Sequence, residues 1–258
     1  MTPGRGGRPS EPSGSTVVPF PGRSPRRRRT VRWAVAGAVA ALLGALAWVL
    51  FSSPVLAVDE VDVTGTRHVA AEAVQERVAP LHGVPLPRVG SSTVRELVGD
   101  LPGVAEIRSV AHPPTRVEVV VREHDARARR DGDQGVNLLL ADGSVLGAVP
   151  AERVEGERLP EFSEELAASP PEDRAEAAAV LASLPPAVAE RVATVDAGGV
   201  GRVRLGLRDG VSLVWGDADD AELKGAVAEA FLEDERHGTR SGGVTEVDVS
   251  VPTRPITR

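Results

Sequence analysis

The 258-residue sequence contains no cysteine and no tyrosine, one methionine, three tryptophans and four phenylalanines. Without cysteine the chain cannot carry a disulfide scaffold, a thiolate zinc site or a cysteine nucleophile. This absence does not fix the redox compartment, because a chain of this length can bury a stable core without cross-links. Lysine is nearly absent too, since Lys224 is the single lysine among thirty basic residues. With 37 acidic residues against those thirty, the chain as a whole is not basic enough for a nucleic-acid-binding protein.

The formal net charge of −7 is unevenly distributed along the chain. Residues 1–32 contain eight arginines and one acid, Glu11, whereas residues 33–58 contain no charged residue. The first segment therefore stands at +7, and the remainder of the chain must stand at −14. A basic end, an uncharged stretch and an acidic body form the charge layout of a membrane protein and not of one soluble globule.

The uncharged stretch predicts a single transmembrane helix over residues 32–53. The run Trp33–Phe51 reads WAVAGAVAALLGALAWVLF, and at about 1.5 Å per residue it nearly spans the ~30 Å hydrocarbon core of a bilayer. Trp33 and Trp48 lie near its ends, where amphipathic rings prefer the headgroup zone. An arginine cluster immediately before the run predicts a cytoplasmic N-terminus and an exported body. The cluster consists of Arg26, Arg27, Arg28, Arg29 and Arg32.

Two export signals are the alternatives to a retained anchor. A cleaved signal peptide could end at Val55-Leu56-Ala57, and Arg28-Arg29 loosely matches a twin-arginine signal. The apolar run is longer than the roughly 7–15 residues of a signal-peptide core, which favours a retained anchor. A buried core helix is disfavoured by the charge asymmetry around the run. Residues 1–31, rich in Pro, Gly, Ser and Arg, are predicted to be a disordered cytoplasmic tail.

A small α+β domain is predicted over residues 57–127. Val61 and Val63 alternate with acids as in a half-buried strand, and Gly65 ends that strand. Two segments of helical spacing follow, the second with Ser91 and Ser92 as candidate N-caps. The predicted order is strand, helix, helix, strand, strand, at residues 58–64, 69–79, 92–101, 104–110 and 116–122.

A second, β-rich domain is predicted over residues 131–251, followed by a C-terminal tail at 252–258. Asp142-Gly143 and Asp209-Gly210 each separate apolar runs, which is typical of two-residue hairpin turns, because Asp-Gly tolerates positive φ angles. The polar segment Arg122–Gly135 suggests some freedom between the domains. Helices are predicted at 171–184 and 219–236 and a last strand at 246–251, in a mostly antiparallel sheet with helices on one face.

Two blocks, VDEVDVTGTRHV from Val58 and LPGVAEIRSVAHPPTRVEVVVREHDARA from Leu101, resemble a POTRA domain of the FtsQ/DivIB family of bacterial cell-division proteins. The resemblance continues through LLLADGSVLG, LRDGVSLVWGD, Lys224 and EVDVSVPTRP, and it covers the chain apart from the tail. The arginine-rich, high-GC composition fits an actinobacterial member. The resemblance implies an α+β protein with a single N-terminal transmembrane helix, a small POTRA-like βααββ domain and a mostly antiparallel β-rich domain with flanking helices.

The sequence offers no assembled site for chemistry. Gly198–Gly201 lacks the Gly-Lys-Ser/Thr of a phosphate loop, and Ser144 is not in a G-x-S-x-G motif. The acidic group Asp217, Asp219 and Asp220 lacks EF-hand spacing and is expected to cap a helix. No two histidines are paired at i, i+4, so we expect neither a metal nor a cofactor, and no enzyme. The chain has five histidines, and each is expected at a surface or turn position: His68, His82, His112, His124 and His237.

The remaining kind of function is binding of another protein, and the predicted last strand, 246–251, offers a sheet edge for it. Nothing long enough follows this strand to cover its outer side, so its backbone groups can accept a strand from another chain. An ordinary edge strand, kept soluble by its charges, is the alternative. The resemblance implies that the FtsB–FtsL pair binds through the late strands of this region. The candidate partner-binding residues are Glu246, Val247, Asp248, Val249, Ser250 and Val251.

With these features, the resemblance implies a septum-assembly protein that spans the cell membrane once and is not an enzyme. It would link early and late division proteins and help to control peptidoglycan synthesis at the division site. The first alternative is a membrane-anchored sensor whose outer domain binds a small ligand. The second, an exported enzyme such as a wall hydrolase, would need a clustered acid/base pair that the sequence does not provide.

Overall fold

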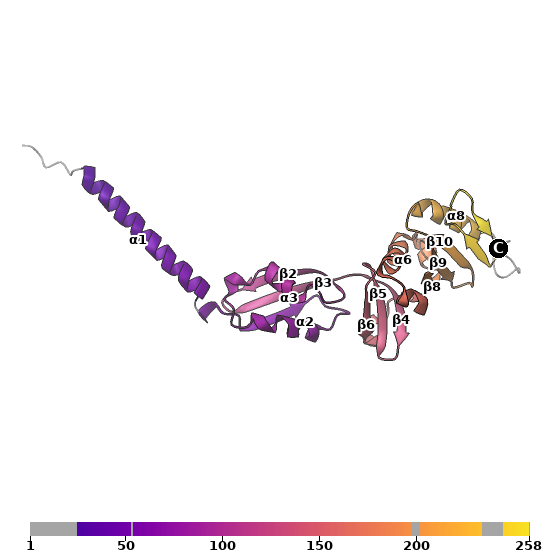
Figure 1. The fold of residues 1–258 in the computed structure, drawn as a ribbon, viewed down its shortest axis with the longest axis horizontal. Helices are drawn as coiled ribbons and strands as arrows, with labels where there is room; N and C mark the ends of the chain where they lie inside the picture. The colour runs from indigo at the N-terminus through magenta and orange to yellow at the C-terminus, as the bar shows by residue number, and fades with distance from the viewer. Residues whose placement is uncertain (1–24, 53, 198–201, 234–244, 258) are drawn as a thin grey trace, which may run out of the picture. The chain divides into compact units, whose positions relative to one another are not determined.

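The computed structural model describes residues 25–52, 54–197, 202–233 and 245–257. By internal contacts the chain divides into two compact units, Met1–Val49 and Leu50–Arg258. The described part of the first unit, residues 25–49, lies entirely within helix α1 (Pro25–Ser52; Figure 1). The segment Thr30–Val49 of this helix is long and apolar enough to cross a membrane. No residue in the most apolar stretch of this segment is buried inside the protein.

Helix α1 begins before the segment that the sequence assigns to the membrane. Its first residue is Pro25, and the first turn of a helix tolerates proline because no intrahelical N–H bond is needed there. The arginines at 26–29 therefore lie within the helix, not in the tail expected before it. Residues 1–24 of that expected tail lie outside the described residues.

The second unit begins with a βααββ domain, as the sequence predicts. Short 3-10 turns at Pro54–Leu56, Ala79–Leu81 and Leu86–Arg88 accompany its regular elements. These elements are β1 (Glu60–Thr64), α2 (Ala71–Val78), α3 (Ser91–Val98), β2 (Val104–His112) and β3 (Arg116–Glu123).

The three strands form one sheet in the order β1-β3-β2. β1 is parallel to β3, with Val61 opposite Val117, and β2 is antiparallel to β3. A parallel pair needs a long crossover connection, and α2 and α3 lie within it. Alternate residues of β3 point to one face and pack with apolar residues of both helices. This core includes Val74, Val78, Val94, Val98, Ile107, Val117, Val119 and Val121, all buried.

The start of α3 differs from the prediction in its cap. Gly90 occupies the N-cap position and makes no side-chain bond to the helix. Ser91 is already helical, and its hydroxyl instead accepts a hydrogen bond of 3.0 Å from the backbone N–H of Ser109 in β2. The expectation that Ser91 or Ser92 caps the helix is therefore wrong, and Ser91 joins the helix to the sheet.

The remaining strands form a nine-stranded sheet in the order β12-β11-β10-β9-β8-β7-β4-β5-β6. Five of its eight pairings are antiparallel. Its elements are β4 (Ala126–Gly132), β5 (Gly135–Leu140), β6 (Val145–Val149), α4 (Ala151–Val154), β7 (Glu161–Phe162), α5 (Glu164–Ala168), α6 (Pro171–Ser183), α7 (Pro186–Ala189), β8 (Val192–Ala197), β9 (Val203–Leu207), β10 (Ser212–Gly216), α8 (Ala221–Glu233), β11 (Glu246–Asp248) and β12 (Ile256–Thr257).

Both predicted Asp-Gly hairpins form, but with three-residue loops. At Asp142-Gly143 the N–H of Leu140 donates to the carbonyl of Ser144 at 2.9 Å, and only the glycine has a positive φ, of +80°. The Asp209-Gly210 loop repeats this pattern, with a φ of +88° at its glycine. A turn followed by one left-handed residue is the usual form of a three-residue hairpin loop. The aspartates therefore do not need the positive φ expected for a two-residue turn.

Helices lie on both faces of the large sheet, contrary to the expectation of one face. Neighbouring residues of a strand point to opposite faces, and β5 is buried on both. Leu139 belongs to the main core together with Val180 of α6. Leu138 packs in a smaller cluster on the opposite face, where α4 contributes Val154.

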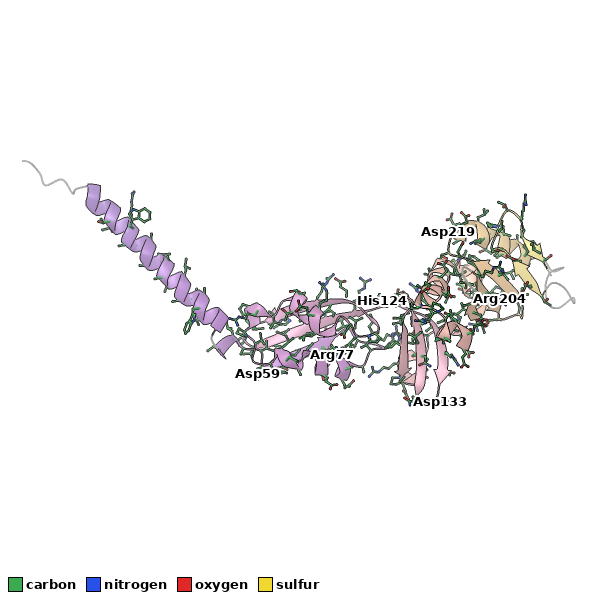
Figure 2. All side chains as sticks on the ribbon, viewed as in Figure 1. Asp59, Arg77, His124, Asp133, Arg204 and Asp219 are labelled. Atoms are coloured by element: carbon green, nitrogen blue, oxygen red, sulfur yellow. The ribbon has the colours of Figure 1, made fainter. Side chains whose placement is uncertain are left out.

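The polar segment Arg122–Gly135 is mostly strand and not a loose linker. Only His124 and Asp125 separate β3 from β4, and Figure 2 labels His124 on this connection. The N–H of His124 donates to the carbonyl of Gly103, and the carbonyl of Asp125 accepts from the N–H of Ala141, each at 2.9 Å. The connection is therefore short and bonded to both domains.

Candidate functional site

The C-terminal edge of the large sheet is built from β10, β11 and β12 (Figure 1). β11 runs parallel to β10, with Val247 opposite Leu213, and α8 lies in the crossover that a parallel pair needs. β12 runs antiparallel to β11 on its outer side, with Thr257 opposite Val247 and Ile256 opposite Asp248. β12 is therefore the last strand of the sheet among the described residues.

This arrangement corrects the predicted edge strand Glu246–Val251 in two respects. The strand ends at Asp248, and its outer side is covered by β12 along two residue positions. The segment 252–258, expected to be only a tail, contains β12. The sequence gives no sign of this cover, because a two-residue strand carries no alternating pattern.

The turn after β11 returns the chain toward the sheet. The N–H of Val249 still donates to the carbonyl of Val214 in β10 at 2.9 Å. The Asp248 carboxylate then accepts from the N–H of Ser250 at 3.0 Å and from its hydroxyl at 2.6 Å. An aspartate that bonds the chain two residues ahead stabilises a turn, and here the turn leads into β12.

The six candidate residues do not share one environment. Val247 and Val249 are buried in the main core, whereas Glu246, Asp248 and Ser250 are half-buried. Val251 is exposed over 54% of its surface, and so is Ile256 of β12, over 53%. The exposed apolar surface of this edge therefore belongs to Val251 and Ile256, and the sequence did not single out Ile256.

A buried cation holds α8 beside this edge. Lys224, exposed over only 2% of its surface, donates from Nζ to the backbone carbonyl of Asp217 at 3.0 Å and to its carboxylate at 2.6 Å. The hydrogen bond from Lys224 lowers the pKa of the Asp217 carboxyl below its ordinary value. Asp217 directly follows β10. The contact with Lys224 therefore joins the first turns of α8 to β10, the strand that pairs with β11. The sequence predicts that Asp217 caps the helix, but its carboxylate instead accepts the hydrogen bond from Lys224.

One histidine, His68, lies in a loop as expected but is not at the surface. His68 is buried, and its two ring nitrogens face the carboxylates of Glu123 and Glu157. No sequence signal could have found this cluster, because the three residues are far apart in the chain. His112 and His124 lie nearer to solvent and pair with Glu118 and Asp142 respectively.

No group of His, Asp and Glu in the part of the chain that the structure describes is placed to hold a metal ion. The Ser144 hydroxyl donates to the Asp142 carboxylate at 2.7 Å within a hairpin loop, which is a turn contact. The glycine-rich segment 198–201 lies outside the described residues.

Comparisons with known proteins match both domains to models of the same protein family. The model of the FtsQ-type POTRA domain matches residues 56–124, and the model of the C-terminal domain of cell division protein FtsQ/DivIB matches residues 126–250. The chain is 30% identical to cell division protein FtsQ of Streptomyces collinus, over 97% of this chain and 95% of that protein. It is 31% identical to the FtsQ of Streptomyces bingchenggensis, over 90% and 87% of the two chains. The match to the FtsQ of Mycolicibacterium smegmatis, at 30% identity over 90% of this chain, spans 66% of that protein.

Proposed function

The chain belongs to the FtsQ/DivIB family of cell division proteins, and from this membership we propose that it is a membrane-anchored, non-catalytic scaffold of the division machinery. In this role it links early and late division proteins at the septum and helps to control septal peptidoglycan synthesis. The family is one of cell division proteins and is not known for enzymes.

The edge at β12 is the observation that carries this proposal. Within the described residues no strand pairs with its outer side, and two exposed apolar residues, Val251 and Ile256, lie beside it. Backbone N–H and C=O groups on an open edge accept an incoming strand, and pockets for alternate side chains give selectivity. The partner strand adds to the outer side of β12 and so extends the large sheet.

The partner is another division protein of the FtsB or FtsL type. The segment 246–251 contributes to this contact in two ways. Its buried valines fix β11 in the sheet, and Val251 contacts the partner beside Ile256. The two hydrogen bonds that the Asp248 carboxylate accepts from Ser250 set the turn that places β12 at the edge.

The apolar helix α1 indicates a single-pass membrane anchor. The arginines at 26–29 and Arg32 place the N-terminus in the cytoplasm, because basic residues beside a membrane span are retained on that side. The domains after the span are then extracytoplasmic, at the division septum, where the partner strand would meet them.

Removal of β12 tests this function directly. In cells depleted of the native protein, a chain that lacks residues 256–258 should reach the membrane but fail to support septation. A matched chain that lacks only Arg258 should support it. Normal division with the 256–258 deletion, at equal protein level, would show that the edge strand is not the partner site.

A further inference from the structure

A buried histidine connects the POTRA domain (residues 56–124) with the following β-rich domain (residues 126–250). His68 lies on the loop between β1 and α2 and is exposed over only 8% of its surface. Its Nδ1 lies 3.2 Å from a carboxylate oxygen of Glu123, at the end of β3. Its Nε2 lies 3.0 Å from a carboxylate oxygen of Glu157, just after α4 in the other domain. One imidazole ring therefore bridges a carboxylate of each domain.

Further polar contacts hold the loop and the two carboxylates in place. The Glu123 carboxylate accepts the backbone N–H groups of three consecutive residues, Arg67, His68 and Val69, at 2.7 to 2.9 Å. The Arg67 guanidinium lies 2.7 Å from the Glu157 carboxylate. The Arg153 side chain in α4 donates to the Val69 carbonyl at 3.1 Å. We call Arg67, His68, Glu123, Arg153 and Glu157 the interdomain cluster.

The positions of the two carboxylates favour a proton on each ring nitrogen. A neutral imidazole has one N–H donor and one acceptor nitrogen, whereas an ionised carboxylate only accepts. The Nε2 contact with Glu157 is a hydrogen bond, and the Nδ1 contact with Glu123, at 3.2 Å, is attractive only when the ring is an imidazolium ion. The two carboxylates then face two cations, His68 and Arg67, and buried charges are tolerated when they are paired in this way.

Other charged groups around the ring are few. Glu72 of α2 and Arg153 of α4 line the same groove as His68. His124 and Asp142 form a separate contact of 3.5 Å on the adjoining connection and hairpin loop. The ring of His68 itself meets carboxylates on both sides, so its proton and Arg67 are the main compensation for Glu123 and Glu157.

We propose that the interdomain cluster is a proton-dependent clasp that sets the orientation of the POTRA domain relative to the β-rich domain. With a proton on both nitrogens, His68 holds Glu123 and Glu157 together and the two domains keep one orientation. When the ring loses a proton, one nitrogen presents a lone pair to a carboxylate, and this contact turns from attractive to repulsive. The domains then separate at this point and move about the connection His124-Asp125.

The contacts around the cluster make such a clasp necessary. Domains joined by short connections move relative to each other unless a large apolar interface holds them. The apolar contact beside the cluster brings Val69 of one domain together with Leu140 and Leu146 of the other around Gly103, and their close approach leaves no room for a side chain at Gly103. The clasp goes beyond the proposed scaffold function and does not depend on it, because its test involves no partner.

The test measures the distance between two labels on the full chain in lipid nanodiscs. Because the chain has no native cysteine, E96C on α3 and A179C on α6, both exposed, accept spin labels at those positions alone. At about pH 5.5 the distance distribution should show a single narrow peak, and in a series of rising pH that peak should be lost once the ring gives up a proton. E157Q, which removes the charge from the β-rich side, should lack the narrow peak throughout the pH series.

The matched control is E155Q, which changes an exposed glutamate on the same loop and should behave as the unmodified chain. R67Q offers a second probe that leaves the buried ring untouched, and it should broaden the peak at low pH. A narrow peak for both E157Q and R67Q at low pH would overturn the clasp. So would a peak in the unmodified chain that does not change with pH, or a pH response that persists in E157Q.

Discussion

At the scale of single residues, two glycines of the POTRA domain differ in what a side chain would meet. Gly65 has a φ of +83°, and a Cβ there would lie 2.2 Å from the carbonyl oxygen of Val121. Gly83 has a similar φ of +79°, but no atom lies within 4 Å of its Cβ position. The close contact at Gly65 brings the following loop, which carries His68, against β3.

Gly65→Ala should therefore destabilise the domain more than Gly83→Ala. The left-handed backbone alone costs alanine about 1 kcal/mol, and this is the whole expected effect at Gly83. At Gly65 the backbone of β3 must also move, and the free energy of unfolding should fall by about 3 kcal/mol. Denaturant unfolding of the two variants in detergent measures the difference, and equal losses would contradict the contact at Val121.

The pair Lys224 and Asp217 gives a prediction that depends on pH. Asp217→Asn should lower the free energy of unfolding by about 1 kcal/mol near neutral pH: the buried Lys224 ammonium loses its charged partner, but solvent screens the pair because the Asp217 side chain is 53% exposed. The pKa of Asp217 is lowered in the folded protein, so its contribution is complete above the unfolded pKa of about 3.9 and is lost as the pH falls through the folded pKa. The difference between variant and native chain should therefore shrink below about pH 4.

Asp219→Asn is the matched control for this pair. Asp219 is exposed, and its substitution should change the free energy of unfolding by less than about 0.5 kcal/mol at any of these pH values. A penalty for Asp217→Asn that stays constant between about pH 6 and pH 3 would rule out the proton linkage.

At the scale of elements, local patterns predicted most of the fold. The βααββ order follows from valines at alternate or helical positions, and both hairpins follow from Asp-Gly between apolar runs. These signals depend only on neighbouring residues, which the sequence displays directly. The helices α6 and α8 were expected for the same reason.

The elements that were missed depend on contacts between distant residues. β7 and β12 each have two residues, too few for any periodic pattern, and they exist because neighbouring strands supply their partners. The cover over β11 and the pairing of His68 with Glu157 were missed for the same reason. The candidate segment 246–251 was correctly expected to contain a strand, but its burial could not be known without β12.

The two ends of that segment should respond differently to the same substitution. Val249→Ala removes methyl groups from a fully buried side chain and should cost about 2 kcal/mol in the free energy of unfolding. Val251→Ala changes an exposed side chain and should cost less than about 0.5 kcal/mol. Calorimetric or denaturant unfolding of both variants measures this, and a larger loss at Val251 would mean that the chain after β11 is packed differently.

At the scale of the whole molecule, an apolar helix precedes two domains, and β12 is the last strand of the large sheet among the described residues. The chain belongs to a family of cell division proteins, and both domains after the anchor match that family's models. The two proposals assign different tasks to the two domains: the β-rich domain would offer the edge at β12, and the interdomain cluster would fix the POTRA domain relative to that edge.

Photo-crosslinking in dividing cells tests the central claim most directly. A photoreactive residue in place of Ile256, exposed over 53% of its surface at β12, should capture a division protein of the FtsB or FtsL type. The same residue in place of Leu223, which is similarly exposed at 48% but lies on α8, should not. Capture of that partner from Leu223 and not from Ile256, with both variants at the membrane, would contradict the assignment of β12 as the binding edge.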